Sequence, residues 1–273
     1  MKNVLVILAA AALCAGCGNN LAGPSGTNSL RPPTALSALS LDSAHVRLSW
    51  TASANAADTT FAGYVVTWGI VADTGAKSSV QFTAGPVGRG AVTFSVRSLL
   101  KSGQISDAAP ITWAGAWRFD AVPLVVTEFN SAQQAGSPGV DAGTATSNPQ
   151  LVSFVDANAD STLDFYLTGP SSSPLQFAGA SNYSPGWHQT LFSTVTTASA
   201  DLNAALTSFP SDNTFTLGAV TLTDNTIYYV RLIGNTGEVN YARVHVHLLG
   251  GSYPSRTVDV RISLQKVSRL PYA

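Results

Sequence analysis

The chain has very few cysteines, methionines and charged residues. Of its 273 residues, two are Cys and one is Met, and both cysteines lie within the first 17 positions. The rest of the chain has no thiol for a disulfide bond, so its fold must be held by packing and hydrogen bonds. Charged residues make up 11% of the chain, whereas about 25% is typical of soluble proteins. This composition disfavours long exposed helices, which rely on Glu–Lys pairs along their surface.

Features of several functional classes are also missing. The formal net charge is −1, so the sequence provides no electrostatic basis for binding nucleic acid. It contains no Gly-x-Ser-x-Gly elbow, no phosphate-binding glycine loop and no His-Glu-x-x-His motif. The only two glutamates, Glu128 and Glu238, are far apart in sequence, so a glycosidase-like pair would need scattered aspartates. We therefore expect a protein that is not an enzyme and has no nucleic-acid partner.

The N-terminus has the order of features found in a secretory signal. Lys2 supplies a positive charge, residues 4–13 are apolar, and Ala15 and Gly16 precede Cys17. An apolar run of this length is too short to span a bilayer, which takes roughly 20 residues. The ending resembles a bacterial lipobox, although Cys14 stands where that motif usually has Leu. An ordinary cleaved signal, in which the cysteines are incidental, is the alternative.

The lipobox resemblance implies an address for the protein. Residues 1–16 would be a lipoprotein signal peptide, and Cys17 would carry the lipid that attaches the protein to a membrane of the bacterial cell envelope. Gly18, rather than Asp, follows the cysteine. By similarity to enteric sorting rules this implies the outer membrane, on a face that the sequence leaves open. Residues 17–32 are rich in Gly, Asn, Ser and Pro without periodicity, which is typical of a flexible tether.

Residues 33–116 contain short stretches in which apolar and polar residues alternate, as in half-buried strands. We expect strands at 45–50, 63–68, 92–99 and 111–113. The opening Pro33, the Trp50 strand, the Tyr-x-Val-x-Trp stretch ending at Trp68, and Ser106 before the last strand together resemble a fibronectin type III domain. The resemblance implies an immunoglobulin-like sandwich that acts as a spacer or a protein-binding module. It departs from the family at Val92, where a tyrosine usually opens the strand.

Residues 117–273 resemble no family closely but continue the strand pattern. Strands are expected at 123–129, 151–155, 163–167, 190–195, 214–221, 226–232, 241–248 and 256–264, and one short helix at 201–206. Turn residues separate these stretches at regular intervals. The sequence therefore predicts an all-β protein, in which the fibronectin-like sandwich is followed by a second β-sandwich-like domain.

The last three predicted strands suggest a polar face. One side of each strand is aliphatic and predicts the core, while the other side predicts an exterior surface. That surface collects the candidate ligand-binding residues Tyr229, Arg231, Tyr241, Arg243, His245 and His247. Aromatic rings and guanidinium groups suit a sugar or an anion. A solvated sheet face is the alternative, and Tyr183 with Trp187 offers another aromatic surface for a glycan.

Two stretches resemble metal sites. Asp156, Asn158, Asp160 and Asp164 stand at positions 1, 3, 5 and 9 of a segment that resembles a calcium loop. Its sixth position lacks the usual Gly and its twelfth lacks an acid, so an inter-strand turn is the alternative. His245 and His247 have a spacing that chelates zinc or copper, for which His188 and Glu238 are candidate further ligands.

These observations favour a lipid-anchored envelope protein with a non-catalytic binding or scaffold role, and a protein or glycan partner. The alternative is a small-ligand or glycan-binding lipoprotein that uses residues 117–273. Of these two candidate metal sites, the calcium loop at Asp156, Asn158, Asp160 and Asp164 is the more specific, and no other cofactor is expected.

The lipobox interpretation can be tested by metabolic labelling. In a bacterial host, the wild-type chain should incorporate labelled palmitate and partition into the membrane fraction. The Cys17→Ala variant should do neither, because it has no thiol to receive the diacylglycerol. Cys14→Ala is the matched control and should label as the wild type does. An unlabelled wild-type chain would rule out the lipid anchor.

Overall fold

A computed structural model describes residues 30–69, 71–77, 79–129, 138–172 and 174–273, of which residues 31–273 form one compact unit. The expected signal peptide, Cys17 and all but the end of the expected tether lie outside the described residues. The fold is all-β, as expected, and consists of four antiparallel sheets. Among the described residues, no helix is long and apolar enough to cross a membrane.

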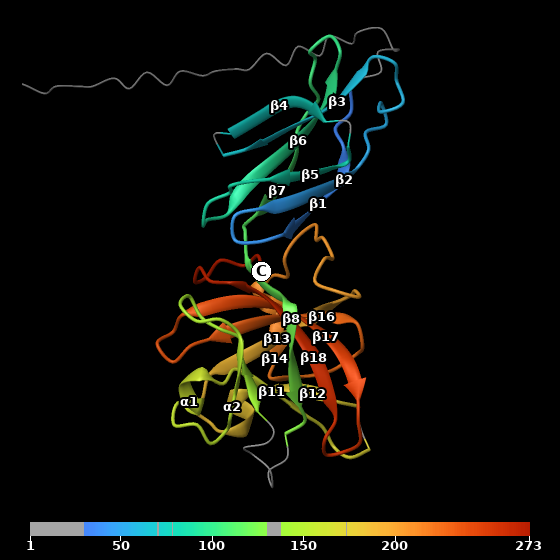
Figure 1. Cartoon of the computed structure of the whole chain (residues 1–273). Helices are drawn as coiled ribbons and strands as arrows, with labels where there is room; N and C mark the ends of the chain where they lie inside the picture. The colour runs from blue at the N-terminus through green and yellow to red at the C-terminus, as the bar shows by residue number, and fades with distance from the viewer. Residues whose placement is uncertain (1–29, 70, 78, 130–137, 173) are drawn as a thin grey trace, which may run out of the picture. The chain divides into compact units, whose positions relative to one another are not determined.

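The first two sheets come from residues 34–113 (Figure 1). One has the order β1-β2-β5 and the other the order β4-β3-β6-β7. Their strands are β1 (Thr34–Ser40), β2 (Val46–Thr51), β3 (Phe61–Trp68), β4 (Val71–Lys77), β5 (Gln81–Ala84), β6 (Val92–Leu100) and β7 (Ala109–Trp113). The expected alternation is confirmed, since Val46, Leu48 and Trp50 are buried while the residues between them are half-buried. The Trp50 and Tyr64 rings meet edge to face in this core, 5.3 Å apart.

The other two sheets come from residues 117–265. A six-stranded sheet has the order β14-β13-β16-β17-β18-β8, and a five-stranded sheet has the order β10-β9-β11-β12-β15. The first contains β8 (Trp117–Thr127), β13 (Gln189–Ala198), β14 (Phe215–Leu217), β16 (Thr226–Ile233), β17 (Val239–Gly250) and β18 (Thr257–Gln265). The second contains β9 (Gly139–Asp141), β10 (Gln150–Val152), β11 (Phe165–Thr168), β12 (Gln176–Gly179) and β15 (Ala219–Thr221). Short helical turns lie at α1 (Ala159–Thr162), α2 (Ala180–Tyr183) and η2 (Asp212–Thr214).

The five- and six-stranded sheets enclose a core of aliphatic and aromatic side chains. The face of the six-stranded sheet that the sequence assigned to the core is buried there, including Val230, Ala242, Val244, Val246, Val258, Val260, Ile262 and Leu264. From the opposing sheet come Phe165 and Phe177, whose rings lie 4.9 Å apart. The period-two alternation correctly assigned these positions because each strand lies against a second sheet.

The expected helix at 201–206 is wrong. Residues 199–212, which we name the cover segment, run from the end of β13 into η2 without a regular helix before it. The Asp201 carboxylate accepts a hydrogen bond from the backbone N–H of Asn203 (2.7 Å), which fixes a local turn. Leu206 instead exchanges backbone hydrogen bonds with Ala38 of β1. A stretch of six residues is too short to be helical without support, so these contacts decide its conformation.

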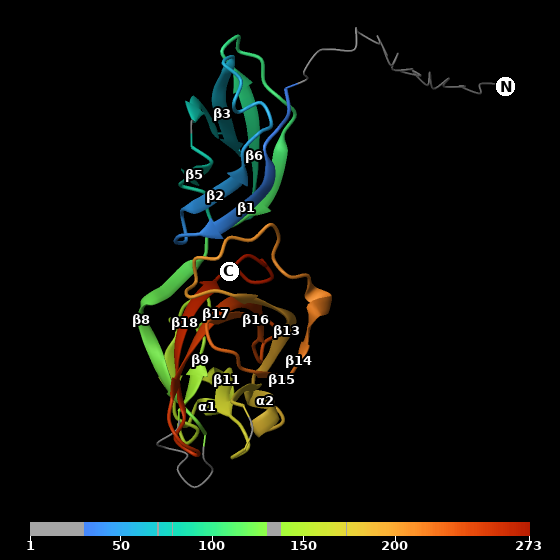
Figure 2. The same ribbon diagram turned by 90° about the vertical axis from the view of Figure 1, so that its right-hand side faces the viewer.

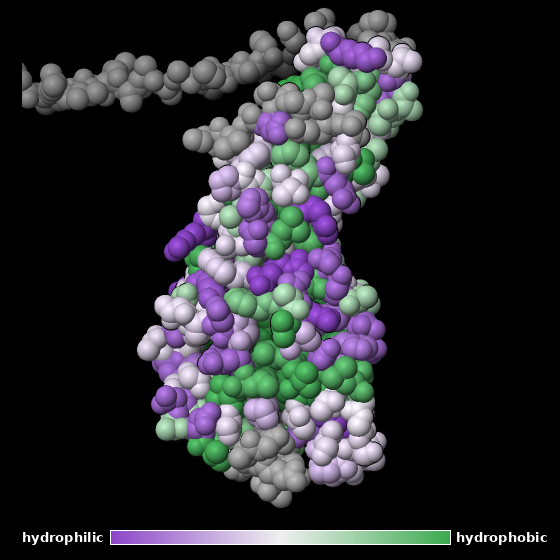
Figure 3. All heavy atoms as spheres, in the orientation of Figure 1, coloured by the Kyte–Doolittle hydropathy of each residue, from purple (hydrophilic) through white to green (hydrophobic). Residues whose placement is uncertain are grey.

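The strand β8 lies at one edge of the six-stranded sheet and exposes apolar side chains. Val122 is 80% exposed and Val125 is 48% exposed. Apolar residues gather around this strand on the face drawn in Figure 3. Pro123 lies in the same stretch and has no N–H to donate to another strand. A proline within an edge strand reduces its capacity to pair with further chains.

A buried ion pair joins the end of β8 to the start of β18. The Nε of Arg256 donates to Oε2 of Glu128 (2.7 Å), and its Nη2 donates to Oε1 of the same carboxylate. Glu128 is fully buried. The same Nη2 also donates to the carbonyls of Gly169 and Pro170, so one guanidinium fixes three segments. The sequence did not indicate this pairing, since 128 positions separate the two residues.

We expect Arg256→Ala to lower the free energy of unfolding by about 3 kcal/mol or more, because it leaves a buried carboxylate without its partner. Denaturant titration monitored by circular dichroism measures the change. His247→Ala is the control, since His247 pairs with Asp224 where both side chains are more than 40% exposed. That variant should change stability by at most about 1 kcal/mol. Equal effects of the two variants would contradict this account.

Candidate functional site

The polar face expected to be exterior is largely buried. The strand register does place its residues together: Tyr229 pairs with Arg243, Arg231 with Tyr241, and His245 lies two positions beyond Arg243 on β17. However, Tyr229, Tyr241, Arg243 and His245 are each no more than 3% exposed. The expectation of an exterior surface is therefore wrong for these four. Arg231 is half-buried, and His247 is partly exposed near the end of the strand.

The cover segment is what removes this face from water. Its Phe209 packs edge to face on Tyr229 and Tyr241, at ring-centroid distances of 5.5 and 5.9 Å. Leu202 of the same segment is 1% exposed and belongs to the same apolar cluster. In Figure 2 the segment is the orange loop near the C-terminal tail, and the Tyr272 ring of that tail lies 6.4 Å from Phe209. Alternation within a strand cannot reveal a covering segment that comes from elsewhere in the chain.

Polar atoms also attach the cover segment to the sheet. Nε2 of His245 lies 2.9 Å from the carbonyl oxygen of Ser199, and Nη2 of Arg243 donates to the carbonyl of Ala204 (2.7 Å). Burial lowers the pKa of Arg243 to about 10, which leaves its guanidinium charged at neutral pH. Among the described residues, Nε of Arg243 and Nδ1 of His245 are buried without a hydrogen-bond partner.

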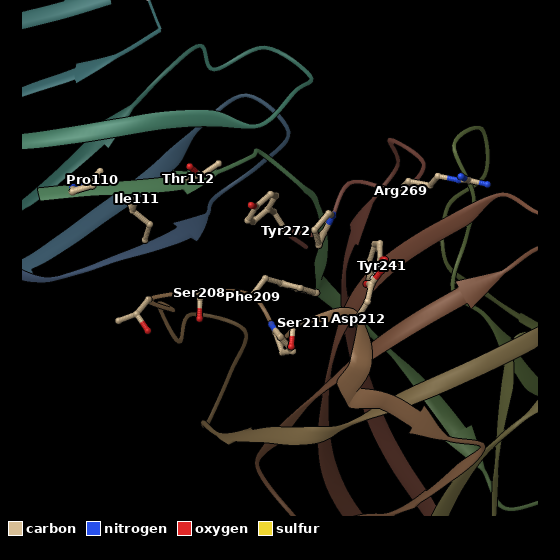
Figure 4. A pocket seen from close by; sticks show the side chains of 13 residues that line it. Pro110, Ile111, Thr112, Ser208, Phe209, Ser211, Asp212, Tyr241, Arg269 and Tyr272 are labelled. Carbon is tan, nitrogen blue, oxygen red and sulfur yellow. Dashed lines mark hydrogen bonds between the residues drawn. The ribbon is translucent and has the colours of Figure 1, made fainter. Parts of the chain in front are cut away.

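A cavity of about 490 Å³ opens where the cover segment turns toward η2 (Figure 4). It is lined by residues 110–112 of β7, residues 207–212, Tyr241, Arg269, Pro271 and Tyr272. The rings of Phe209 and Tyr272 and several prolines give it apolar walls. Hydroxyl groups come from Thr112, Ser208 and Ser211, and a carboxylate comes from Asp212. The cavity therefore combines apolar surfaces with short polar side chains.

One hydrogen bond orients the polar side of the cavity. The hydroxyl of Tyr241 donates to Oδ1 of Asp212 (2.6 Å). Burial, together with this carboxylate, raises the pKa of Tyr241 to about 12, so the phenol stays protonated at neutral pH. Asp212 is an exposed residue, so its other carboxylate oxygen can accept a further hydrogen bond. The exposed Arg269 side chain extends away from the Tyr241 and Tyr272 rings in Figure 4.

A second polar cluster lies between β11 and β13. Nδ1 of His188 is 3.2 Å from Oδ1 of Asp164, and the backbone N–H of Ala142 donates to the other oxygen of that carboxylate (2.8 Å). The hydrogen bond to Asp164 raises the pKa of His188, whereas burial raises the pKa of Asp164 and of nearby Asp141. These partners hold backbone segments together, and this cluster was not indicated by the sequence spacing.

The structure does not assemble the expected calcium loop. The residues Asp156, Asn158 and Asp160 are exposed around α1, and the carboxylate of Asp156 accepts from the backbone N–H of Ser153 (3.1 Å). Asp164 is buried on the other side of α1, and His188 and Ala142 already contact its oxygens. Within the part of the chain that the structure describes, no three His, Cys, Asp or Glu side chains are grouped to hold a metal ion.

The expected histidine chelate is likewise not formed. Nε2 of His245 contacts Ser199 under the cover segment, and Nδ1 of His247 contacts Asp224 (2.9 Å). His188 contacts Asp164, as described above. These histidines therefore have three separate sets of partners.

The aromatic surface expected at Tyr183 and Trp187 belongs to a small core. Both rings are half-buried, and they lie 5.1 Å apart. Each also packs on Phe154, at 4.8 Å for Tyr183 and 6.3 Å for Trp187. Their main role in the structure is therefore packing beside α2.

Comparison with known proteins adds no further constraint to this site. No family model matches the chain, and no curated protein matches it. The cavity and the residues around it are therefore the features of this chain that indicate a function.

We expect the His188–Asp164 pair to make the protein less stable as the pH rises. A histidine whose folded pKa is raised contributes stability below its unfolded value of about 6.5, and this is lost as the pH rises through the folded pKa. Melting temperatures between pH 6 and 9 should fall in the wild type and fall less in His188→Gln. His45→Gln, at an exposed His–Asp pair, is the control and should follow the wild type. Parallel curves for all three proteins would contradict this expectation.

Proposed function

We propose that this chain is a lipid-anchored protein of the bacterial cell envelope that binds a small glycan, without catalysis, in the cavity beside the cover segment. The observation that carries the proposal is the cavity itself, whose volume of about 490 Å³ falls within the usual range for small-molecule sites. Cys17 would attach the protein to the membrane, and the outer membrane is the proposed location.

The chemistry of the cavity walls supports a carbohydrate ligand. A sugar ring has apolar C–H faces and a rim of hydroxyl groups, so it needs both kinds of partner. Tyr272 and Phe209 provide apolar ring surface. Thr112, Ser208 and Asp212 provide groups that exchange hydrogen bonds with hydroxyls. Mostly apolar walls with a few placed polar groups are typical of ligand sites.

The lining residues also favour binding over catalysis. They include one carboxylate, Asp212, and no His, Cys, Lys or Glu. That carboxylate already accepts a hydrogen bond from the Tyr241 hydroxyl. Because the pKa of Tyr241 is raised, its phenol stays protonated at neutral pH and is a poor general base. The cavity therefore lacks the nucleophile and base pairing that covalent catalysis requires.

We further propose that residues 33–116 are a fibronectin type III module that holds residues 117–273 away from the membrane. The three- and four-stranded sheets, with orders β1-β2-β5 and β4-β3-β6-β7, support this assignment. The division of the chain into these two domains is part of the same proposal.

A thermal-shift screen tests the glycan proposal. The screen uses a protein made of residues 18–273. An oligosaccharide that binds it, added at a concentration of about 100 times its Kd, should raise the melting temperature by roughly 5–10 °C. Asp212→Asn keeps the shape and the acceptor for Tyr241 but removes the charge, and should weaken binding about tenfold. Asp156→Asn, at an exposed aspartate outside the cavity, should bind as the wild type does. A panel of neutral and acidic oligosaccharides that produces no saturable shift would overturn the proposal.

A further inference from the structure

The imidazole of His245 is fully buried beneath the cover segment and has one hydrogen-bond partner among the described residues. That partner, the carbonyl oxygen of Ser199, can only accept a hydrogen bond, so Nε2 must carry the proton. In the neutral ring Nδ1 is then an unprotonated nitrogen with no donor beside it. A second proton would go to Nδ1 and would create a buried cation there.

The charges that face His245 do not compensate such a cation. On β17 its neighbours are Arg243 and His247, and on β18 its register partner is Arg261. The register partner on β16 is Ile227, which is apolar. The cover segment contributes Asp201, whose carboxylate already accepts hydrogen bonds from both the backbone and the side chain of Asn203.

One further cation lies nearby on β8. The positive charge of Arg118 lowers the pKa of both Arg243 and Asp201. Its guanidinium also donates a hydrogen bond to the side chain of Asn203 (3.0 Å). Arg118 is itself paired with the carboxylate of Asp120. Of the charges that act on the His245 ring, Arg261 and His247 therefore oppose a second proton, and the engaged carboxylate of Asp201 favours it. Burial, reinforced by Arg261, lowers the pKa of His245, although the bond to Ser199 and the charge of Asp201 act in the opposite direction.

The cover segment connects this histidine to the cavity. It is attached through Ser199 and Ala204, whose carbonyls contact His245 and Arg243, and through the backbone pairing of Leu206 with Ala38. The next residues, 207–212, line the cavity directly. A loss of the contact between Ser199 and His245 therefore loosens the segment that forms one wall of the cavity.

We propose that His245 is a proton-sensing site: its protonation in acid loosens the cover segment, and this in turn releases the ligand from the cavity. The release of ligand rests on the proposed function, whereas the loosening of the segment does not. The opened segment exposes the imidazole to water, where its second proton is no longer disfavoured. Stability of the closed segment is thus present above pH 6.5, about the ordinary histidine value, and is lost as the pH falls through the lowered folded pKa. This direction is opposite to that of His188.

Hydrogen exchange of the amides at 199–206 tests the loosening directly. After correction for intrinsic exchange rates, the wild type should lose protection about tenfold or more between pH 7.5 and pH 5.0. His245→Gln retains an N–H that can donate to Ser199 but does not titrate, so its protection should stay constant. His247→Gln is the same change two residues further along β17, at a partly exposed site, and should lose protection as the wild type does.

Titration of the wild-type histidine ring signals by NMR keeps the inference testable if His245→Gln fails to fold. The chain has four histidines, so substitution of the other three assigns the remaining signal. The His245 signal should titrate below pH 6.5, over the same pH range in which the amides at 199–206 lose protection. A His245 signal that titrates at or above 6.5, or protection that does not change with pH, would overturn the inference.

Measurement of ligand affinity at two pH values separates the proton-sensing role of His245 from the proposed function. If the thermal-shift screen identifies an oligosaccharide, its Kd should rise at least tenfold from pH 7.5 to 5.0 in the wild type and in His247→Gln, but not in His245→Gln. An unchanged Kd in the wild type would overturn the coupling to the cavity. If no oligosaccharide binds, the proposed function fails and the release of ligand fails with it. Loss of protection at 199–206 would then still establish the proton-sensing segment.

Discussion

The central strands β16 and β17 of the six-stranded sheet are removed from water on both faces, and the other features of residues 117–273 depend on this. One face meets the five-stranded sheet across an aliphatic core. The other face carries Tyr, Arg and His side chains and is covered by residues 199–212. Without that cover, a guanidinium and an imidazole would be in water, as the alternation of the strands suggests. With it, both become buried groups whose hydrogen bonds must be made within the protein.

The polar contacts on the covered face give specificity rather than a large net gain in stability. A buried charge loses hydration energy, which its partners must replace. The guanidinium of Arg243 donates to the carbonyl of Ala204 rather than to a carboxylate, so this replacement is incomplete. Most of the attraction between the cover segment and the sheet therefore comes from its apolar side chains: Phe209, which packs on Tyr229 and Tyr241, and Leu202, which is buried in the same cluster. The polar bonds fix where the segment lies, and its position in turn determines the shape of the cavity beside it.

The strands and their inward faces could largely be read from the sequence. Val46, Leu48 and Trp50, and the valines of β17 and β18, alternate with polar residues, and each set is buried as expected. The candidate site could not be read in this way. Of the six residues expected on an exterior surface, Tyr241 alone lines the cavity beside Asp212, and it does so with its hydroxyl bonded to that carboxylate. Thr112, Phe209 and Tyr272 carried no signal, because their meeting depends on three segments that are distant in sequence.

The sequence by itself determined the all-β class, the faces of the long strands and the lack of thiols beyond residue 17. These are local properties, since a period of two depends only on the backbone of one strand and its immediate burial. The tertiary structure decided what covers each face. The pairing of Glu128 with Arg256, the burial of His245 and the cavity at Asp212 all arise between segments far apart in the chain. Such contacts follow from the packing of whole sheets and loops, which no local pattern encodes.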